Sequence, residues 1–435
     1  MTSVQDKLQA ILDRLARRSS EERVFLAVYA DAARAEAHAA DERRRAGLAL
    51  GPLDGVIVSI KDLFDVAGEV TRAGSLALRE RAPAPVDAVA VQRLRRAGAV
   101  IVGKTNMVEF AFSGLGLNAH FGAPGNAHDA DRIPGGSSSG AGVSVAEGTS
   151  DIAIGSDTGG SVRIPAAMNG VVGFKPTARR VPLDGVFPLS PSLDSVGPLA
   201  RTVQDCAFAD AVMAGERPRL LVPLGLPGLT IGVPRGRLLR GLEPMVEEAF
   251  ARSLRRLEHA GARIVDHPLE DLLDRMAEAT STASIASVEA AEVHKEWIDA
   301  KAHLIDPRIR APIARSGRLP ASAHRRMMRE RAALAAAMDE RLRPVDVLAL
   351  PTTPISAPLI APLEEDDDLY DRTDWLVLRN TMVANQFDLT SITLPASDVV
   401  RPVGFMLVAR HGQDHRLLDI AAGIEAALRD SSGSG

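Results

Sequence analysis

The chain has 435 residues, of which 46% are hydrophobic and 25% are charged, a composition that is ordinary for a globular protein. Its formal net charge of −5 argues against a nucleic-acid-binding protein that works by neutralising phosphates. The single cysteine, Cys206, excludes an internal disulfide and a cysteine-based metal cluster. Its helical surroundings predict a small core residue.

The amino-terminal stretch MTSVQDKLQAILDRLARRSSEER is charged throughout and lacks the apolar centre of a signal peptide. No run in the sequence approaches the ~18 apolar residues that are needed to cross a bilayer. We therefore expect a cytoplasmic protein that binds neither a membrane nor nucleic acid. We expect it to be a monomer or a homodimer.

Apolar residues at spacings of three and four predict helix across residues 5–46. Beyond them, helical and strand patterns alternate, which is typical of a sheet covered by helices. Strands are predicted at residues 55–62, 99–105, 151–157, 229–236, 262–269, 346–354 and 403–410. Helices are predicted at residues 86–97, 140–148, 202–215, 244–261 and 413–429.

One part of the chain interrupts this alternation. Residues 270–343 are mostly helical in pattern and rich in Ala, Glu and Arg, which predicts a helical insertion or cap. The acidic run EEDDD at 364–368 is predicted to be an exposed loop. The closing SSGSG, residues 431–435, is expected to be a disordered tail outside the fold.

Two clusters of glycine and serine, GGSSSGAG at 135–142 and DTGGS at 157–161, lie close together in the sequence. Neither has the lysine of a phosphate-binding P-loop, and neither fits the dinucleotide-binding fingerprint. A flexible linker would not be followed at once by helix and strand patterns rich in Val, Ile and Ala. A nucleophilic serine fits better, because successive amides in TGGS can form an anion-binding nest and the hydroxyls of GGSSS can relay a proton.

Such a serine needs a base. The ten histidines are scattered, and none follows a nucleophile elbow. His411 and His415 are four residues apart, but HGQDH lacks the glutamate of a HExxH zinc motif, so surface histidines are the favoured interpretation. Lys61, Lys104 and Lys175 each lie at the end of an apolar stretch, where burial lowers the pKa of a lysine. The residues alone favour Lys61 but leave the choice among the three open.

The run 135–166, GGSSSGAGVSVAEGTSDIAIGSDTGGSVRIPA, resembles the motif of the amidase signature family over its full length. GVIVSIKDLFDVAG, GAVIVGKTNMVEFAFSG and GVVGFKPTARRVPLDGVFP extend the resemblance, as do DVLALPTTP and PVGFMLVAR near the carboxyl end. It covers residues 50–215 and 340–430, whereas 215–340 is the part that the family varies. The resemblance implies one α/β domain over residues 1–430, an α/β/α sandwich whose mixed central sheet is covered by helices, with a helical insertion or cap.

The resemblance also implies a Ser–cis-Ser–Lys triad. Ser161 is the expected nucleophile, Ser137 the bridging serine, joined to Gly136 by a cis peptide, and Lys61 the base. The oxyanion hole is expected from the N–H groups of Ser161 and the three residues before it: Thr158, Gly159 and Gly160. The supporting residues are expected to be Ser138, Asp157 and Arg163. The substrate-binding residues are expected to be Gly135, Gly136 and Met107.

Other polar residues near these motifs have two interpretations. Ser139 is expected to be a structural hydrogen-bonding group. Asn106 and Glu109, in TNMVEFA, either line the pocket or support it. One segment departs from the family pattern, because DLTSITLPASDVV lacks the glycine that many members carry before the proline.

The predicted function is therefore hydrolysis of a C–N amide bond through an acyl-enzyme on Ser161, with no metal and no organic cofactor. The expected substrate is a small amide, uncharged or aryl-bearing, and carbamates (urethanes) and esters suit the same machinery. The alternative is a component like the amidase chain of a tRNA-dependent amidotransferase, which works in a complex with partner proteins.

Overall fold

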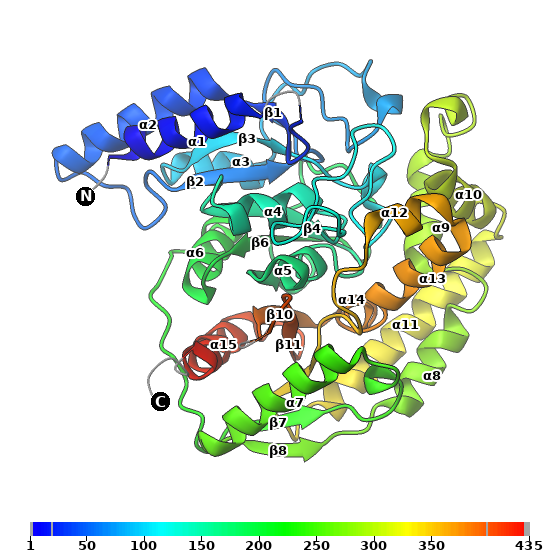
Figure 1. Ribbon diagram of the computed structural model, residues 1–435. Coiled ribbons are helices and arrows are strands. Elements are labelled where there is room, and N and C mark those ends of the chain that lie inside the picture. The colour runs from blue at the N-terminus through cyan, green and yellow to red at the C-terminus, as the bar shows by residue number, and fades with distance from the viewer. Residues whose placement is uncertain (1–2, 19–20, 397–398, 430–435) are drawn as a thin grey trace.

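The computed structural model describes residues 3–18, 21–396 and 399–429 of the chain. Within these residues, eleven strands form one mixed sheet through the middle of the molecule (Figure 1). Strand β2 runs parallel to β3 and β4, and β7 runs parallel to β8 and β9, whereas the remaining neighbours are antiparallel. In spatial order the strands are β1 (Phe25–Val28), β3 (Val100–Thr105), β2 (Ile57–Lys61), β4 (Ile152–Asp157), β6 (Ser195–Ala200), β5 (Val172–Lys175), β10 (Thr390–Pro395), β11 (Gly404–Ala409), β9 (Val347–Pro351), β7 (Thr230–Val233) and β8 (Arg263–Asp266).

Helices cover both faces of this sheet, so the molecule has the three layers of an α/β/α sandwich, and the predicted fold class is confirmed. One face is covered by α1 (Val4–Arg17), α2 (Ala30–Arg45), α4 (Ser139–Glu147) and α5 (Arg163–Asn169). The other face is covered by α3 (Val89–Arg96), α6 (Val203–Ala214), α7 (Pro244–His259) and α15 (Asp414–Arg429).

A third group of helices gathers beside the sheet, on the right in Figure 1. It comprises α8 (Glu270–Ala279), α9 (Ile285–His294), α10 (Pro307–Ser316), α11 (Ala321–Arg341), α12 (Ile360–Glu365), α13 (Asp367–Leu378) and α14 (Met382–Gln386). The first four lie within the predicted helical insertion at 270–343, so its helical character is confirmed. None of the helices in the described ranges is both long and apolar enough to span a bilayer.

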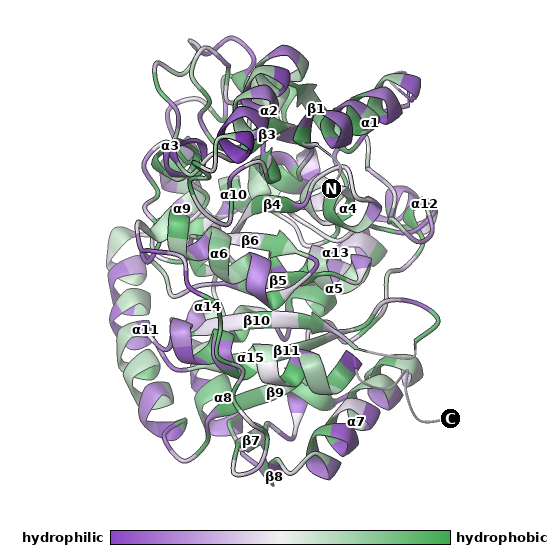
Figure 2. Ribbon diagram, turned by 90° about the vertical axis from the view of Figure 1, so that its left-hand side faces the viewer, coloured by the Kyte–Doolittle hydropathy of each residue, from purple (hydrophilic) through white to green (hydrophobic). Residues whose placement is uncertain are grey.

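The core follows from the two-residue period of the buried strands. In β11, Phe405 and Leu407 pack with residues of α15, whereas Met406 and Val408 point the other way and pack with residues of α8 and α11. The covering helices alternate between hydrophilic and hydrophobic residues, as α7 and α11 show in Figure 2. A strand that is apolar on both faces and a helix that is apolar on one face therefore fix the layers.

Two predicted elements are wrong. The helix predicted across 5–46 is interrupted by β1, because the short apolar run FLAV pairs antiparallel with β3. Four apolar residues are too few for periodicity to separate a strand from a helix. The acidic run at 364–368 is not a loop: Asp366 caps α13 by accepting a hydrogen bond from the Leu369 N–H at 2.9 Å. Acidic side chains stabilise a helix at its amino-terminal end.

Candidate active site

The site begins at the carboxyl ends of two neighbouring parallel strands. Lys61 is the last residue of β2 and Asp157 is the last residue of β4, and these strands pair in parallel register. Parallel strands bring their carboxyl ends to the same edge of a sheet. The two predicted motifs, almost a hundred residues apart in the chain, therefore meet at one edge.

The Lys61 side chain reaches two serines there. Its Nζ lies 2.7 Å from Ser137 Oγ and 2.9 Å from Ser156 Oγ, and all three side chains are buried. Burial lowers the pKa of Lys61 to about 7, although the charges of Asp157 and Asp194 offset part of this effect. A substantial fraction of this lysine is therefore neutral near neutral pH and can accept a proton from a hydroxyl.

Ser137 is held by backbone contacts on both sides. The peptide between Gly136 and Ser137 is cis, as the resemblance implied. The carbonyl oxygen of Ser137 accepts a hydrogen bond from the Val108 N–H at 3.0 Å. The next residue, Ser138, donates its N–H to the carbonyl oxygen of Ser161 at 3.3 Å. The segments that carry Ser137 and Ser161 consequently lie directly against each other.

Ser161 lies at the end of the loop between β4 and α5, and it is 4% exposed. Within the described residues, neither its hydroxyl nor the N–H groups of Gly159, Gly160 and Ser161 make a hydrogen bond. Gly160 has a φ of 144°, and a Cβ at this position would overlap the Thr381 hydroxyl, so the loop requires glycine here. The loop thus presents consecutive free N–H donors next to a free hydroxyl.

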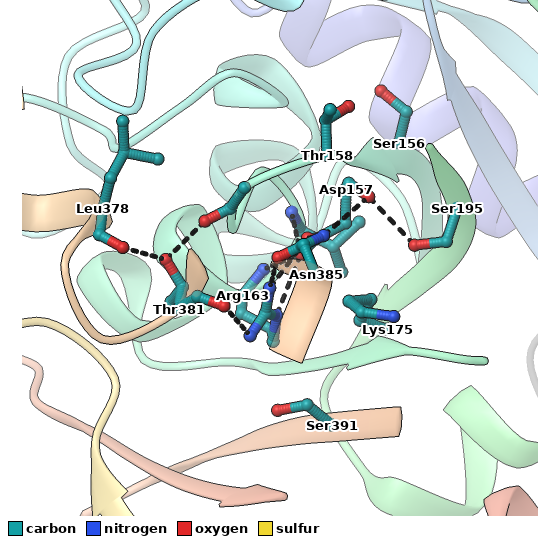
Figure 3. Close-up of polar contacts among 12 residues, drawn as sticks. Ser156, Asp157, Thr158, Arg163, Lys175, Ser195, Leu378, Thr381, Asn385 and Ser391 are labelled. Atoms are coloured by element: carbon teal, nitrogen blue, oxygen red, sulfur yellow. Dashed lines mark hydrogen bonds and ion pairs between the residues drawn. The ribbon is translucent and has the colours of Figure 1, made fainter. Parts of the chain in front are cut away.

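An ion pair beneath the loop holds it in place (Figure 3). Arg163 and Asp157 are fully buried, with Nη2 of the arginine 2.8 Å from Oδ1 of the aspartate. Asn385 donates to the same carboxylate oxygen at 2.9 Å. Burial raises the pKa of Asp157, but the charge and hydrogen bonds of Arg163 outweigh it and hold the pKa at about 2. The Asp157 carboxylate is therefore ionised at neutral pH.

Asp157→Asn should lower the free energy of unfolding by about 3–5 kcal/mol, because it leaves the Arg163 charge buried without its counter-ion. Urea denaturation measures the change. Asp266→Asn is the matched control, since Asp266 pairs with Arg235 in an exposed ion pair and should have far less effect. Equal effects of the two substitutions would contradict a bracing role for the buried pair.

A second carboxylate holds the other side of the loop. Asp194 accepts hydrogen bonds from the Thr158 hydroxyl and from the N–H groups of Leu189 and Ser190. Burial raises the pKa of Asp194 to about 6, although these hydrogen bonds and the charge of Lys61 oppose the rise. Above that pH its negative charge also acts on Lys61.

The remaining predicted binding residues are packed into the protein. The Met107 side chain is fully buried, and its Cγ lies beside Gly74. Gly135 packs against Pro165 and Met168 of α5, and Gly136 packs against Gly116. Asn106 and Glu109, which the sequence left with two interpretations, are both buried and engaged in hydrogen bonds. Asn106 donates to the carbonyls of Arg23 and Gly122, and Glu109 accepts from Ser75 and contacts His120.

The other candidate bases and ligands lie apart from the serines. Lys104 Nζ is 3.7 Å from Asp62, and Lys175 donates to the carbonyl of Pro176. His411 and His415 contact different carboxylates, those of Asp388 and Glu216. Across 3–18, 21–396 and 399–429, no three His, Cys, Asp or Glu side chains are grouped as a metal site. Cys206 is buried, as expected.

Sequence reasoning missed four residues of this site. Ser156 directly precedes Asp157 in IGSDTGGS, so its place at the end of a buried strand was a usable signal. Asp194, Thr381 and Asn385 carried no motif, and only the tertiary structure brings them to the loop. Thr381 donates to the carbonyl of Gly159 at 2.7 Å, and its own carbonyl accepts from Arg163 at 2.8 Å.

Comparisons with known proteins agree with this architecture. The family model described as Amidase matches residues 6–418. A 2-amino-5-chloromuconic acid deaminase from Comamonas testosteroni is 38% identical over 406 residues, covering 91% of this chain and 86% of that protein. The A-type subunit of a glutamyl-tRNA(Gln) amidotransferase from Acidothermus cellulolyticus is 34% identical over 474 residues, covering 99% of this chain and 92% of that protein.

Solved structures of amidases are also similar to this chain. A crystal structure described as an amidase superposes with a TM-score of 0.87 at 34% identity, covering 98% of this chain and 96% of that one. The native peptide amidase from Stenotrophomonas maltophilia superposes with a TM-score of 0.78 at 29% identity, covering 98% of this chain and 94% of that one.

Proposed function

Since this chain belongs to the amidase family, whose reaction is hydrolysis of C–N amide bonds, we propose that it cleaves a small amide through an acyl-enzyme on Ser161. The proposed substrate is uncharged or aryl-bearing. The observation that carries the mechanism is the contact of 2.7 Å between Lys61 Nζ and Ser137 Oγ, beside the loop of Ser161. That contact joins a base of lowered pKa to a hydroxyl that can pass on a proton.

In the first half of the reaction, neutral Lys61 takes the proton of Ser137, which in turn takes the proton of Ser161. The Ser161 oxygen then attacks the carbonyl carbon of the amide. The N–H groups of Gly159, Gly160 and Ser161, with that of Thr158, stabilise the negative oxygen that forms. Asp157, Arg163 and Ser138 support the loop that presents these donors.

In the second half, the proton on Lys61 returns through Ser137 to the leaving nitrogen, and ammonia or an amine departs. Water then attacks the acyl-enzyme, and the same two residues take its proton. The carboxylic acid leaves and Ser161 regains its hydrogen. Carbamates and esters fit this scheme as well, because only the leaving group differs.

Covalent labelling tests the assignment. A fluorophosphonate should modify Ser161, as peptide mass spectrometry would show, and Ser161→Ala should abolish the modification. A panel of neutral aryl and aliphatic amides, carbamates, esters and 2-amino-5-chloromuconic acid then defines the substrate. We expect the neutral amides to be hydrolysed fastest. Labelling at another residue, or turnover of the acid alone, would overturn the proposal.

A second candidate function follows from the similarity to the A-type chains of amidotransferases, which extends over 99% of this chain. In that case the chain would act inside a complex on a tRNA-borne substrate. Size-exclusion chromatography of the protein from its native cells distinguishes the two functions. A chain that hydrolyses simple amides without any partner favours the independent amidase.

A further inference from the structure

Three apolar side chains are spaced along one helical face, from the protein surface to the loop that carries Ser161. Trp375 and Leu378 lie three residues apart on α13, and Met382, four residues further on, begins α14. Arg379 and Thr381, between the two helices, keep right-handed helical dihedral angles. Residues at these spacings share one face of a helix. We call Trp375, Leu378 and Met382 the α13–α14 stripe.

The inner end of the stripe contacts the loop that carries Ser161. A methyl group placed on Gly159 would lie 3.3 Å from Leu378 Cδ2 and 3.5 Å from Met382 Cγ. The Thr381 hydroxyl fixes this arrangement, because it contacts the carbonyls of both Gly159 and Leu378, at 2.7 and 3.1 Å. Leu378 and Met382 therefore stand directly beside the expected oxyanion donors.

The stripe is only partly covered. Leu378 and Met382 are half-buried, whereas their neighbours Val377 and Thr381 are fully buried. Trp375, at the outer end, is 60% exposed. In Figure 3 the Leu378 side chain points to the same side of the loop as the hydroxyls of Thr158 and Ser156. The stripe thus runs from an exposed tryptophan to two half-buried side chains beside Gly159, in the loop that carries Ser161.

The two charged side chains nearest the inner end of the stripe, Asp374 and Arg379, are engaged in hydrogen bonds. Asp374 accepts hydrogen bonds from the Ser113 hydroxyl and the Gly114 N–H. Arg379 donates to the carbonyls of Leu238 and Arg240. At its inner end, where Leu378 and Met382 lie beside Gly159, the stripe consequently offers hydrophobic contact rather than charge to a bound molecule.

We propose that the α13–α14 stripe determines the substrate specificity of this enzyme and binds the apolar acyl group of its substrate. Trp375, at the exposed end of the stripe, would contact that group first. This inference rests on the proposed role of Ser161 as nucleophile. It names the substrate class more closely, as amides whose acyl group is an aryl or a longer alkyl chain. The binding free energy for such substrates comes from burying that acyl group against Leu378 and Met382.

Two sulfonyl fluorides of different size test the stripe. Each transfers its sulfonyl group to the Ser161 oxygen, with loss of fluoride and of the serine proton. Phenylmethanesulfonyl fluoride carries an aryl group and methanesulfonyl fluoride does not. We expect Leu378→Ala to lower the ratio of their inactivation rates about tenfold and Trp375→Ala to lower it about threefold. Leu220→Ala, at an exposed leucine in the segment between α6 and β7, should leave the ratio within about twofold of the wild-type value.

The outcomes separate the inference from the function on which it rests. If neither fluoride modifies Ser161 in the wild-type enzyme, the proposed function fails and the inference fails with it. If both modify Ser161 but the ratio is unchanged in both stripe variants, the stripe does not determine specificity and the function stands. Trp375 is exposed, so its variant keeps the fold and decides the question if Leu378→Ala is unstable.

Discussion

Replacing Ser161 by alanine should lower kcat/KM by at least about 10⁴-fold while leaving the fold unchanged. The loss is large because no acyl-enzyme can form without the hydroxyl, and the free N–H donors alone retain little of the rate. The fold should persist because, in the described part of the chain, that hydroxyl holds no other group. Amide turnover and thermal unfolding measure the two effects.

Ser139→Ala is the matched control for this substitution. Ser139 is also buried, and its hydroxyl donates to the carbonyl of Asn106 at 3.3 Å rather than to Lys61 or Ser161. Its removal should change kcat/KM by less than about tenfold. If Ser161→Ala kept a comparable fraction of the activity, Ser161 would not be the nucleophile.

The second large effect concerns pH. kcat/KM should rise about tenfold per pH unit below about pH 7 and level off above it, because only neutral Lys61 accepts the proton. The sign follows from the charge: burial lowers the pKa of this lysine, so raising the pH through 7 converts it to the active form. Lys61→Met should lose most of the activity at every pH, with a loss on the order of 10⁴-fold.

Two aspartate variants assign the midpoint of this profile to Lys61. The charge of Asp194 raises the pKa of Lys61, so Asp194→Asn should move the midpoint to lower pH. Asp210 also titrates near 7, because burial raises its pKa to about 7, but it pairs with Arg180 and not with the lysine. Asp210→Asn should leave the midpoint unchanged. A shift in Asp210→Asn and none in Asp194→Asn would show that another group controls the rate.

The parts of this protein that the sequence predicts are those with local signals. Strands such as β2, β4 and β11 are short apolar runs bounded by breakers, and the predicted ranges agree with them to within about two residues at each end. Ser137 and Ser161 lie in the long motif at 135–166 and Lys61 lies in the separate stretch GVIVSIKDLFDVAG, and the structure brings Lys61 and Ser137 into contact. A motif fixes residue identity and order, so it can be recognised before any fold is known.

The parts that could not be predicted depend on distant contacts. The strand β6 was missed because SVGPLA contains a glycine and a proline, which weaken the strand pattern although its neighbours β4 and β5 bury it. Asn385 and Thr381 stand in NTMVANQFD, a helical stretch without any catalytic motif. Their role comes from contacts more than 200 residues away in the chain, which no local pattern contains.

The contacts of Thr381 and Asn385 with the Ser161 loop have a consequence for the order in which the protein can fold during synthesis. The loop of Ser161 is complete in sequence when little more than a third of the chain has been synthesised, yet Asn385 and Thr381 follow it by over 200 residues. A growing chain therefore carries Ser161 long before it contains the residues that hold the loop of Ser161 in place. The hydrogen bonds with which Thr381 and Asn385 hold the Ser161 loop can therefore all form only after synthesis has passed Asn385.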